Sequence, residues 1–210
     1  MSAQKNPARL FLMSFAILFL EVCLIRWLPG QVRALSYFKN LVLISSFLGL
    51  GIGSLLAGRV RSLMPAFPIL FLMEIGTARL LGRYVISNVG SMDEHLWLLY
   101  ADLPMGSPTF PLGAAILIFY GLNTLTFVSL GQLLGEAFKD IQSPLVAYGA
   151  NLLGSLAGTL AFVAVSFAER GPRLWFASAL ALLACSVGTL RRVMAILSAL
   201  VIFVVIAPPD

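Results

Sequence analysis

The chain has 210 residues, of which 60% are hydrophobic and only 11% are charged, whereas soluble domains carry about one quarter charged residues. This composition argues against a soluble globular protein and predicts a polytopic membrane protein. The net charge of +5 comes from basic residues at the ends of apolar runs, which is typical of membrane topology and not of a nucleic-acid-binding face.

We predict an all-α fold, a single transmembrane helical bundle of about seven spans, with six to eight as the range. A polar leader (1–8) precedes it, residues 82–110 form an interfacial loop, and 208–210 form a tail. The first apolar run has no small-residue cleavage site, so it is expected to stay as a span. The predicted spans are 9–28, 37–58, 63–81, 111–138, 145–168, 174–190 and 193–207.

The first hairpin contains an unusual set of polar side chains for a membrane segment: Glu21, Arg26, Lys39 and Asn40. A charge at the bilayer centre costs about 2.5 to 3.5 kcal/mol, so each needs a partner, water or an interface. Arg26 and Lys39 are near the hairpin end and are expected to snorkel, whereas Glu21 is the best buried candidate. It is either a proton- or cation-linked site or an ion pair with Lys39 or Arg26, and the structural alternative is favoured.

Glu74 is a second carboxyl group within an apolar run, and it either marks a cavity or reaches a nearby arginine. In the loop, Asp93, Glu94 and His95 are adjacent in the sequence. Neighbouring residues rarely converge on one ion, so we predict no metal site. Polar side chains in the later spans are Asn123, Gln132 and Asn151.

Small residues recur every four positions in three predicted spans, which places them on one helix face where another backbone can approach closely. GSLLAG (53–58) is echoed by GSLAG (154–158). The echo is consistent with an internal repeat of about three helices, although close packing alone selects such sequences. The predicted packing residues are Gly49, Gly53 and Ala57, then Gly131 and Gly135, and finally Ala150, Gly154 and Gly158.

Four segments of the sequence resemble the membrane-spanning N-terminal part of bacterial spermidine synthase-like proteins. They are EVCLIRWL (21–28), SYFKN (36–40), FLGLGIGSLLAGR (47–59) and AYGANLLGSLAG (147–158). The resemblance covers about residues 10–167 and implies a helical membrane region of the kind that is fused to an aminopropyltransferase- or methyltransferase-like domain. No counterpart of that domain's glycine-rich loop or acidic residues is present, so no catalytic residue can be assigned.

Two classes of function remain. The first is a module that anchors or assembles with a protein partner or a fused or split soluble domain. The second is a transporter-like module for a small, polyamine-like cation, with a path lined by Glu21, Asn123, Gln132 and Asn151. We expect no enzymatic activity, cofactor or nucleic-acid partner, and the oligomeric state stays open. Counting loop Lys and Arg places the N-terminus in the cytoplasm, and the resemblance implies the bacterial inner membrane.

Overall fold

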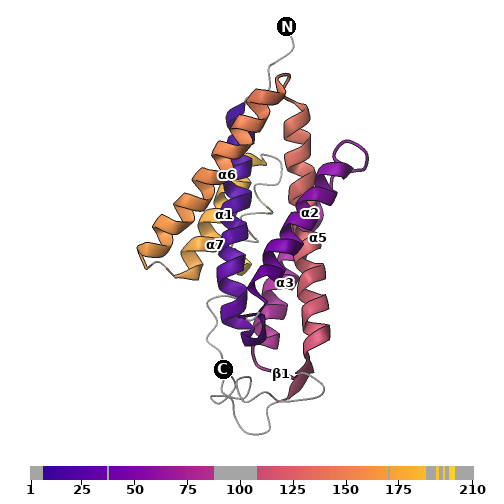
Figure 1. Cartoon of the computed structure of the whole chain (residues 1–210), viewed down its shortest axis with the longest axis vertical. Helices are drawn as coiled ribbons and strands as arrows, with labels where there is room; N and C mark the ends of the chain where they lie inside the picture. The colour runs from indigo at the N-terminus through magenta and orange to yellow at the C-terminus, as the bar shows by residue number, and fades with distance from the viewer. Residues whose placement is uncertain are drawn as a thin grey trace.

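The computed structural model describes residues 7–36, 38–87, 108–169 and 171–187, together with 193, 196 and 199–201, but not the side chains of 33, 34, 39 and 87. This part of the chain is mostly helical, as predicted (Figure 1). Its elements are α1 (Pro7–Gln31), η1 (Arg33–Ser36), α2 (Lys39–Leu56), η2 (Met64–Ala66), α3 (Phe67–Leu81), β1 (Val85–Ser87), β2 (Thr109–Pro111), α5 (Leu112–Lys139), α6 (Pro144–Phe167) and α7 (Pro172–Ser186).

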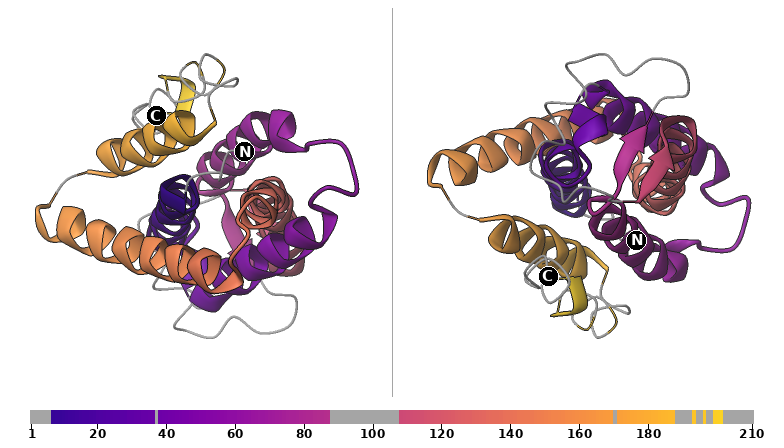
Figure 2. Two further views of the ribbon diagram at one scale, coloured as in Figure 1. Left: turned by 90° about the horizontal axis from the view of Figure 1, so that it is seen from above. Right: turned by 90° about the horizontal axis from the view of Figure 1, so that it is seen from below.

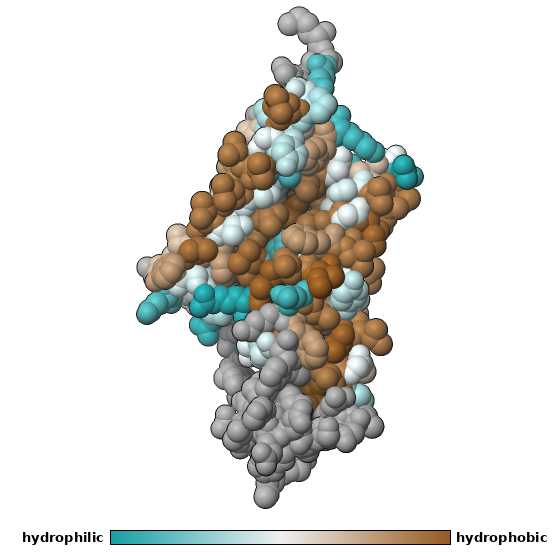
Figure 3. Space-filling view, viewed as in Figure 1, coloured by the Kyte–Doolittle hydropathy of each residue, from teal (hydrophilic) through white to brown (hydrophobic). Residues whose placement is uncertain are grey.

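Four helical segments are long and apolar enough to cross a membrane, namely α1, the continuous η2–α3 segment (Met64–Leu81), α5 and α6. Helices α2 and α7 are apolar but shorter. Apolar side chains cover much of the outer surface seen in Figure 3, as expected for a surface in contact with lipid. The structure therefore supports four of the seven predicted spans. Several predicted segments lie outside the described residues: most of the span 193–207, most of the loop 82–110, the leader residues 1–6 and the tail 208–210.

Helix α1 continues beyond Pro29, where the sequence predicts its end. A proline removes its own N–H donor, but the hydrogen bond from Val32 N–H to the Leu28 carbonyl is made at 3.0 Å. Unpaired backbone groups are costly in apolar surroundings, and this favours continuing the helix through a proline. Helix α1 therefore runs to Gln31, three residues past the end of the predicted span of about 9–28.

Helices α2 and α5 pack in parallel through glycine faces. A Cβ atom at Gly53 would lie only 2.6 Å from the Gln132 backbone nitrogen, and one at Gly49 would lie 2.8 Å from the Phe127 Cβ atom. Further along, a Cβ atom at Gly135 would lie 2.8 Å from the Cβ atom of Ala57. Only residues without a side chain permit this backbone approach, so the glycines fix the register of the pair.

Helices α1 and α6 form a second parallel pair of the same kind. A Cβ atom at Gly154 would lie 3.0 Å from the Ser14 Cβ atom, and one at Gly158 would lie 3.1 Å from the Phe15 backbone. The pair diverges below this contact, so that the lower end of α6 leans away from α1 in Figure 1. Among the described helices, the two glycine-mediated pairs are also the two most extensive helix contacts.

The described helices group into two three-helix bodies. The α5 body consists of α2, α3 and α5, and the α1 body consists of α1, α6 and α7; contacts within each body are more extensive than contacts between them (Figure 2). In each body a long central helix packs against a parallel glycine-rich helix and a shorter third helix. The first three long helices can be matched in order with the last three, α1 with α5, α2 with α6 and α3 with α7. Under this match the α2–α5 contact corresponds to the α6–α1 contact, and the α3–α5 contact corresponds to the α7–α1 contact. Because α6 is parallel to α1 and a short turn joins it to α5, the two central helices are antiparallel.

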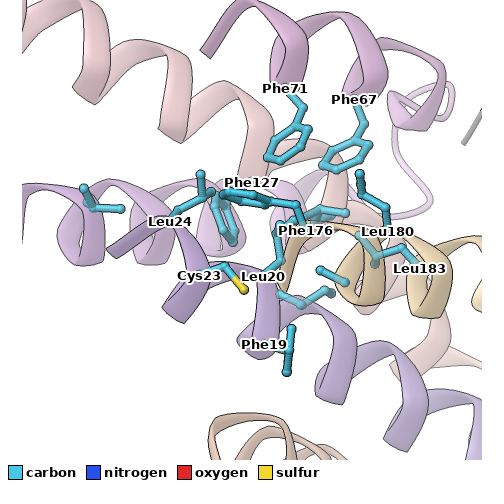
Figure 4. Packing of buried hydrophobic residues seen from close by; sticks show 14 of the residues in the cluster. Phe19, Leu20, Cys23, Leu24, Phe67, Phe71, Phe127, Phe176, Leu180 and Leu183 are labelled. Atoms are coloured by element: carbon cyan, nitrogen blue, oxygen red, sulfur yellow. The ribbon is translucent and has the colours of Figure 1, made fainter. Parts of the chain in front are cut away.

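An aromatic cluster occupies the centre of the bundle where α7 meets α1 and α3 (Figure 4). The ring of Phe176 lies edge-on to Trp27 at 5.5 Å and to Phe71 at 5.9 Å, measured between ring centroids. Aromatic pairs in this arrangement add to the stabilisation from burial alone. The contact with Phe71 also joins the two bodies.

Strands β1 and β2 pair in parallel at the ends of the 82–110 segment, with Val85 opposite Thr109 and Ser87 opposite Pro111. The prediction of an all-α fold missed this pair, because three-residue strands are too short to show a strand periodicity. The pairing places the end of α3 beside the start of α5.

Candidate functional site

The structure separates the predicted polar residues into buried and exposed groups. Glu21, Glu74, Asn123 and Gln132 are buried, each with an exposed fraction of 1% or less. Asn151 is half-buried, Arg26 and Asn40 are exposed, and the Lys39 side chain is not described. The loop residues Asp93, Glu94 and His95 lie outside the described ranges.

Glu21 contacts a hydroxyl group on the neighbouring helix of its hairpin. The hydroxyl oxygen of Ser46 on α2 is within hydrogen-bonding reach of Glu21 Oε1 and lies 2.9 Å from the Leu43 carbonyl oxygen. Glu21 Oε2 is buried and has no hydrogen-bond partner in the part of the chain that is described. One oxygen of this carboxyl group is therefore left open to a proton, a water molecule or a cation.

Glu74 has the same kind of environment within the α5 body. The hydroxyl oxygen of Thr126 on α5 lies 3.1 Å from Glu74 Oε2 and 2.9 Å from the Leu122 carbonyl oxygen. Glu74 Oε1 is also buried without a hydrogen-bond partner among the described residues. The two carboxyl groups thus share one pattern: one oxygen at a helix hydroxyl, the other unpaired.

Asn123 joins α5 to α2 next to both sites. We refer to the set of residues at these contacts as the polar layer: Glu21, Ser45, Ser46, Glu74, Asn123 and Thr126. Its side-chain amide nitrogen donates to the Val42 carbonyl at 2.9 Å and to the Ser45 hydroxyl at 2.6 Å. Its side-chain oxygen is buried and unpaired within the described residues. Ser45 adjoins Ser46 in sequence, and Asn123 is one helical turn from Thr126, so the layer extends from α1 through α2 and α5 to α3.

The hydroxyl groups in this layer allow each carboxyl group to exist in two forms. A hydroxyl group carries one proton, so Ser46 cannot donate to both Glu21 and Leu43 at once. When Ser46 donates to Leu43, its oxygen can accept a hydrogen bond from the carboxylic acid form of Glu21; when it donates to Glu21, it pairs with Oε1 of the carboxylate form. The same reasoning applies to Thr126 and Glu74. Rotation of the hydroxyl group therefore lets one oxygen of each carboxyl group be hydrogen-bonded whether or not the group carries a proton.

Gln132 has a different role from the one expected for a residue that lines a path. Its side-chain nitrogen donates to the Val60 carbonyl at 3.1 Å and the Arg61 carbonyl at 3.3 Å, and its side-chain oxygen accepts from Leu63 N–H at 2.7 Å. These bonds fasten the connection between α2 and η2 to α5. Lys139 adds a hydrogen bond to the Ala57 carbonyl in the same region.

Replacing Gln132 with leucine is expected to destabilise the protein, because three backbone groups lose their partner while the side-chain volume changes little. A hydrogen bond of this kind typically contributes about 0.5 to 1.5 kcal/mol. Thermal unfolding in detergent, followed by circular dichroism, measures the effect. Gln142→Leu, in the exposed α5–α6 connection, is the matched control. Equal unfolding midpoints for the two variants would argue against this role.

Arg26 and Asn151 make their side-chain contacts outside the polar layer. Arg26 donates to the Ser166 hydroxyl, and its guanidinium carbon lies 5.2 Å from the centroid of the Trp175 ring. Arg26 therefore stabilises the corner where α1, α6 and α7 meet, and it does not pair with Glu21. Asn151 accepts a hydrogen bond from Ser14 at 2.7 Å, inside the α1–α6 interface.

Sequence reasoning missed the hydroxyl partners of the two carboxyl groups. Ser45 and Ser46 form a polar pair within the apolar run of α2, and Thr126 follows Asn123 by three residues. Such a pair is a weak signal, because serine and threonine in apolar helices often bond only to their own backbone.

A cleft of about 390 Å³ lies where α1 begins and α5 ends. Its lining is unusually rich in charge for this chain, and the polar layer contributes nothing to it. The lining residues are Arg9, Leu133, Glu136, Ala137, Lys139 and Asp140.

No family model matches the chain, and no curated protein or solved structure shows significant similarity to it.

Proposed function

We propose that this chain is a transporter-like membrane module that moves a small cation, and that its buried carboxyl groups hold either a proton or that cation. The observation that carries the proposal is the pair Glu21 and Glu74, each with one buried oxygen that has no partner in the described structure. Ionisable residues within membrane helices are costly and usually mark ion or substrate pathways.

The arrangement of the helices supports the same proposal. Two antiparallel central helices, each with an equivalent set of partners, are the pattern that an inverted repeat produces. Many transporters are built from such repeats, and their sites lie near the repeat interface. The GSLLAG segment begins in the last turn of α2 and the GSLAG segment lies in α6, and these helices correspond under this pairing.

A polyamine is the first substrate class to test, because the sequence resembles the membrane part of spermidine synthase-like proteins. That choice rests on analogy and not on the geometry of the site. We place the module in the bacterial cytoplasmic membrane with its N-terminus inside, and include α2, α7 and the 193–207 run among its spans. The excess of Lys and Arg in the loops of that side supports the orientation.

Uptake by proteoliposomes tests the proposal. The purified chain is reconstituted, a pH gradient is imposed, and entry of radiolabelled spermidine is compared with entry into protein-free liposomes; sodium ions serve as a second probe. Faster entry of either cation supports the proposal. If neither cation enters faster than in protein-free liposomes, a transport function is contradicted.

A second candidate function is an anchor that assembles with a soluble partner, and the charged cleft at one end of the bundle favours it. Arg9, Glu136 and Asp140 present both signs of charge there, as a polar docking segment would require. Mass spectrometry of the gently solubilised native protein would detect a stoichiometric partner. The anchoring function further requires that Arg9→Glu release that partner, and recovery of the chain alone would contradict it.

A further inference from the structure

The two carboxyl groups of the polar layer differ in which helices they join. Glu74 on α3 contacts Thr126 on α5, and both helices belong to the α5 body. Glu21 is on α1, the centre of the α1 body, whereas its partner Ser46 is on α2 in the α5 body. The Glu21–Ser46 contact therefore crosses from one body to the other.

Each body is held together by contacts that permit little sliding. In the α5 body a Cβ atom at Gly131 would lie 2.7 Å from the Leu50 Cα atom, and in the α1 body Gly158 packs against the Phe15 backbone. Backbone atoms cannot move aside as side chains can, so each pair behaves as a rigid unit.

Contacts between the bodies are less extensive, and they include a backbone approach at one end of the bundle, where a Cβ atom at Gly82 would lie 2.7 Å from the Gln31 carbonyl oxygen. Besides Glu21 and Ser46, the side-chain contacts include the edge-on pair Phe71 and Phe176 and a hydrogen bond of 3.1 Å from Arg79 to the Gln31 side chain. Side-chain contacts of this kind can be broken and remade at modest cost, whereas the glycine-packed pairs cannot. If the fold opens, it opens between the bodies.

This inference rests on the proposed function and assigns different roles to its two carboxyl groups. We propose that Glu21 is the group that exchanges a proton for a cation, and that it becomes accessible when the α1 body and the α5 body part at the Ser46 contact. Glu74 stays enclosed in the α5 body and holds α3 to α5. The cation bound at Glu21 is an ammonium group or a monovalent metal ion, which a single carboxyl group and a hydroxyl group can coordinate.

Charged and titratable groups on the helices around Glu21 are few. No ion-pair partner of Glu21 occurs among the described side chains. The groups carried by the packed elements are Lys39 on α2, Glu74 and Arg79 on α3, Tyr120, Glu136 and Lys139 on α5, Tyr148 on α6, and Arg173 and Cys185 on α7.

Labelling with dicyclohexylcarbodiimide tests this assignment without any transport assay. The reagent is apolar, and the proton of a carboxylic acid moves to one of its nitrogens as the carboxyl oxygen adds to its carbon. Migration of the acyl group then gives a stable N-acylurea that retains every atom of both reactants. Peptide mass spectrometry quantifies the adduct at Glu21 and at Glu74 in the same molecule.

In the folded, reconstituted protein we expect at least about tenfold more adduct at Glu21 than at Glu74, because opening between bodies is easier than opening within one. Ser46→Ala should raise labelling of Glu21 and leave Glu74 unchanged. In protein unfolded with sodium dodecyl sulfate, both should react equally. Labelling of Glu74 as fast as Glu21, or a Glu21 that reacts only after unfolding, would overturn the assignment. If labelling follows expectation while no cation is taken up, the transport function fails and the two-body assignment stands.

Discussion

The substitution Gly53→Val is expected to prevent α2 from pairing with α5. The first side-chain atom alone would lie 2.6 Å from the Gln132 backbone nitrogen and 2.9 Å from the Gly131 carbonyl carbon. Overpacking costs about 1 to 3 kcal/mol where neighbours can adjust. Here the neighbours are backbone atoms of a long helix, so the helices must separate. We expect Gly53→Val to aggregate or to unfold at a much lower temperature than the wild type.

Gly51→Val is the matched control for this prediction. It makes the same chemical change two residues away on α2, at a position where a Cβ atom meets no atom within 4 Å. Size-exclusion chromatography and thermal unfolding in detergent compare the two variants. A Gly53→Val protein as monodisperse and as stable as Gly51→Val would contradict the close approach of the backbones.

The substitution Glu21→Gln is expected to abolish cation uptake while preserving the fold. The amide has nearly the shape of the carboxyl group and can still bond to Ser46, but it can neither release a proton nor carry a negative charge. A cation at the bilayer centre without a counter-charge costs about 2.5 to 3.5 kcal/mol, and each 1.4 kcal/mol is about a factor of ten. Spermidine uptake should therefore fall by about 60- to 300-fold.

Two comparisons control the Glu21→Gln result. Glu169→Gln removes an exposed carboxyl group at the α6–α7 turn and should transport like the wild type. Equal unfolding midpoints for Glu21→Gln and the wild type would show that lost uptake is not lost structure. Undiminished uptake by Glu21→Gln would remove Glu21 from the transport mechanism.

Local patterns in the sequence were enough to locate the helices and their small-residue faces, but not to pair them. Gly49, Gly53 and Gly154 stand out by their spacing. Any small-residue face can receive any other, however, so nothing in the spacing says that α2 binds α5 and α6 binds α1. The grouping into two bodies follows from those pairings and could be seen only in three dimensions.

For the candidate site, the sequence likewise identifies the residues but not their contacts. Glu21 and Glu74 are conspicuous as carboxyl groups within apolar runs. Their surroundings depend on helix rotation, which an almost uniformly apolar helix does not encode in its sequence. For that reason the sequence offers Arg26 as a partner of Glu21, whereas Arg26 lies against Trp175. It also groups Gln132 with the path-lining residues, although Gln132 binds the backbone of the α2–η2 connection.

Proton movement during spermidine uptake would decide whether the buried carboxyl layer works as proposed. A pH-sensitive dye sealed inside wild-type proteoliposomes should report that the interior becomes alkaline as spermidine enters, because Glu21 exchanges a proton for the cation. The same preparation with Glu21→Gln should show neither uptake nor a pH change. Spermidine entry without proton movement in the wild type, or an unchanged proton signal in Glu21→Gln, would contradict exchange at Glu21.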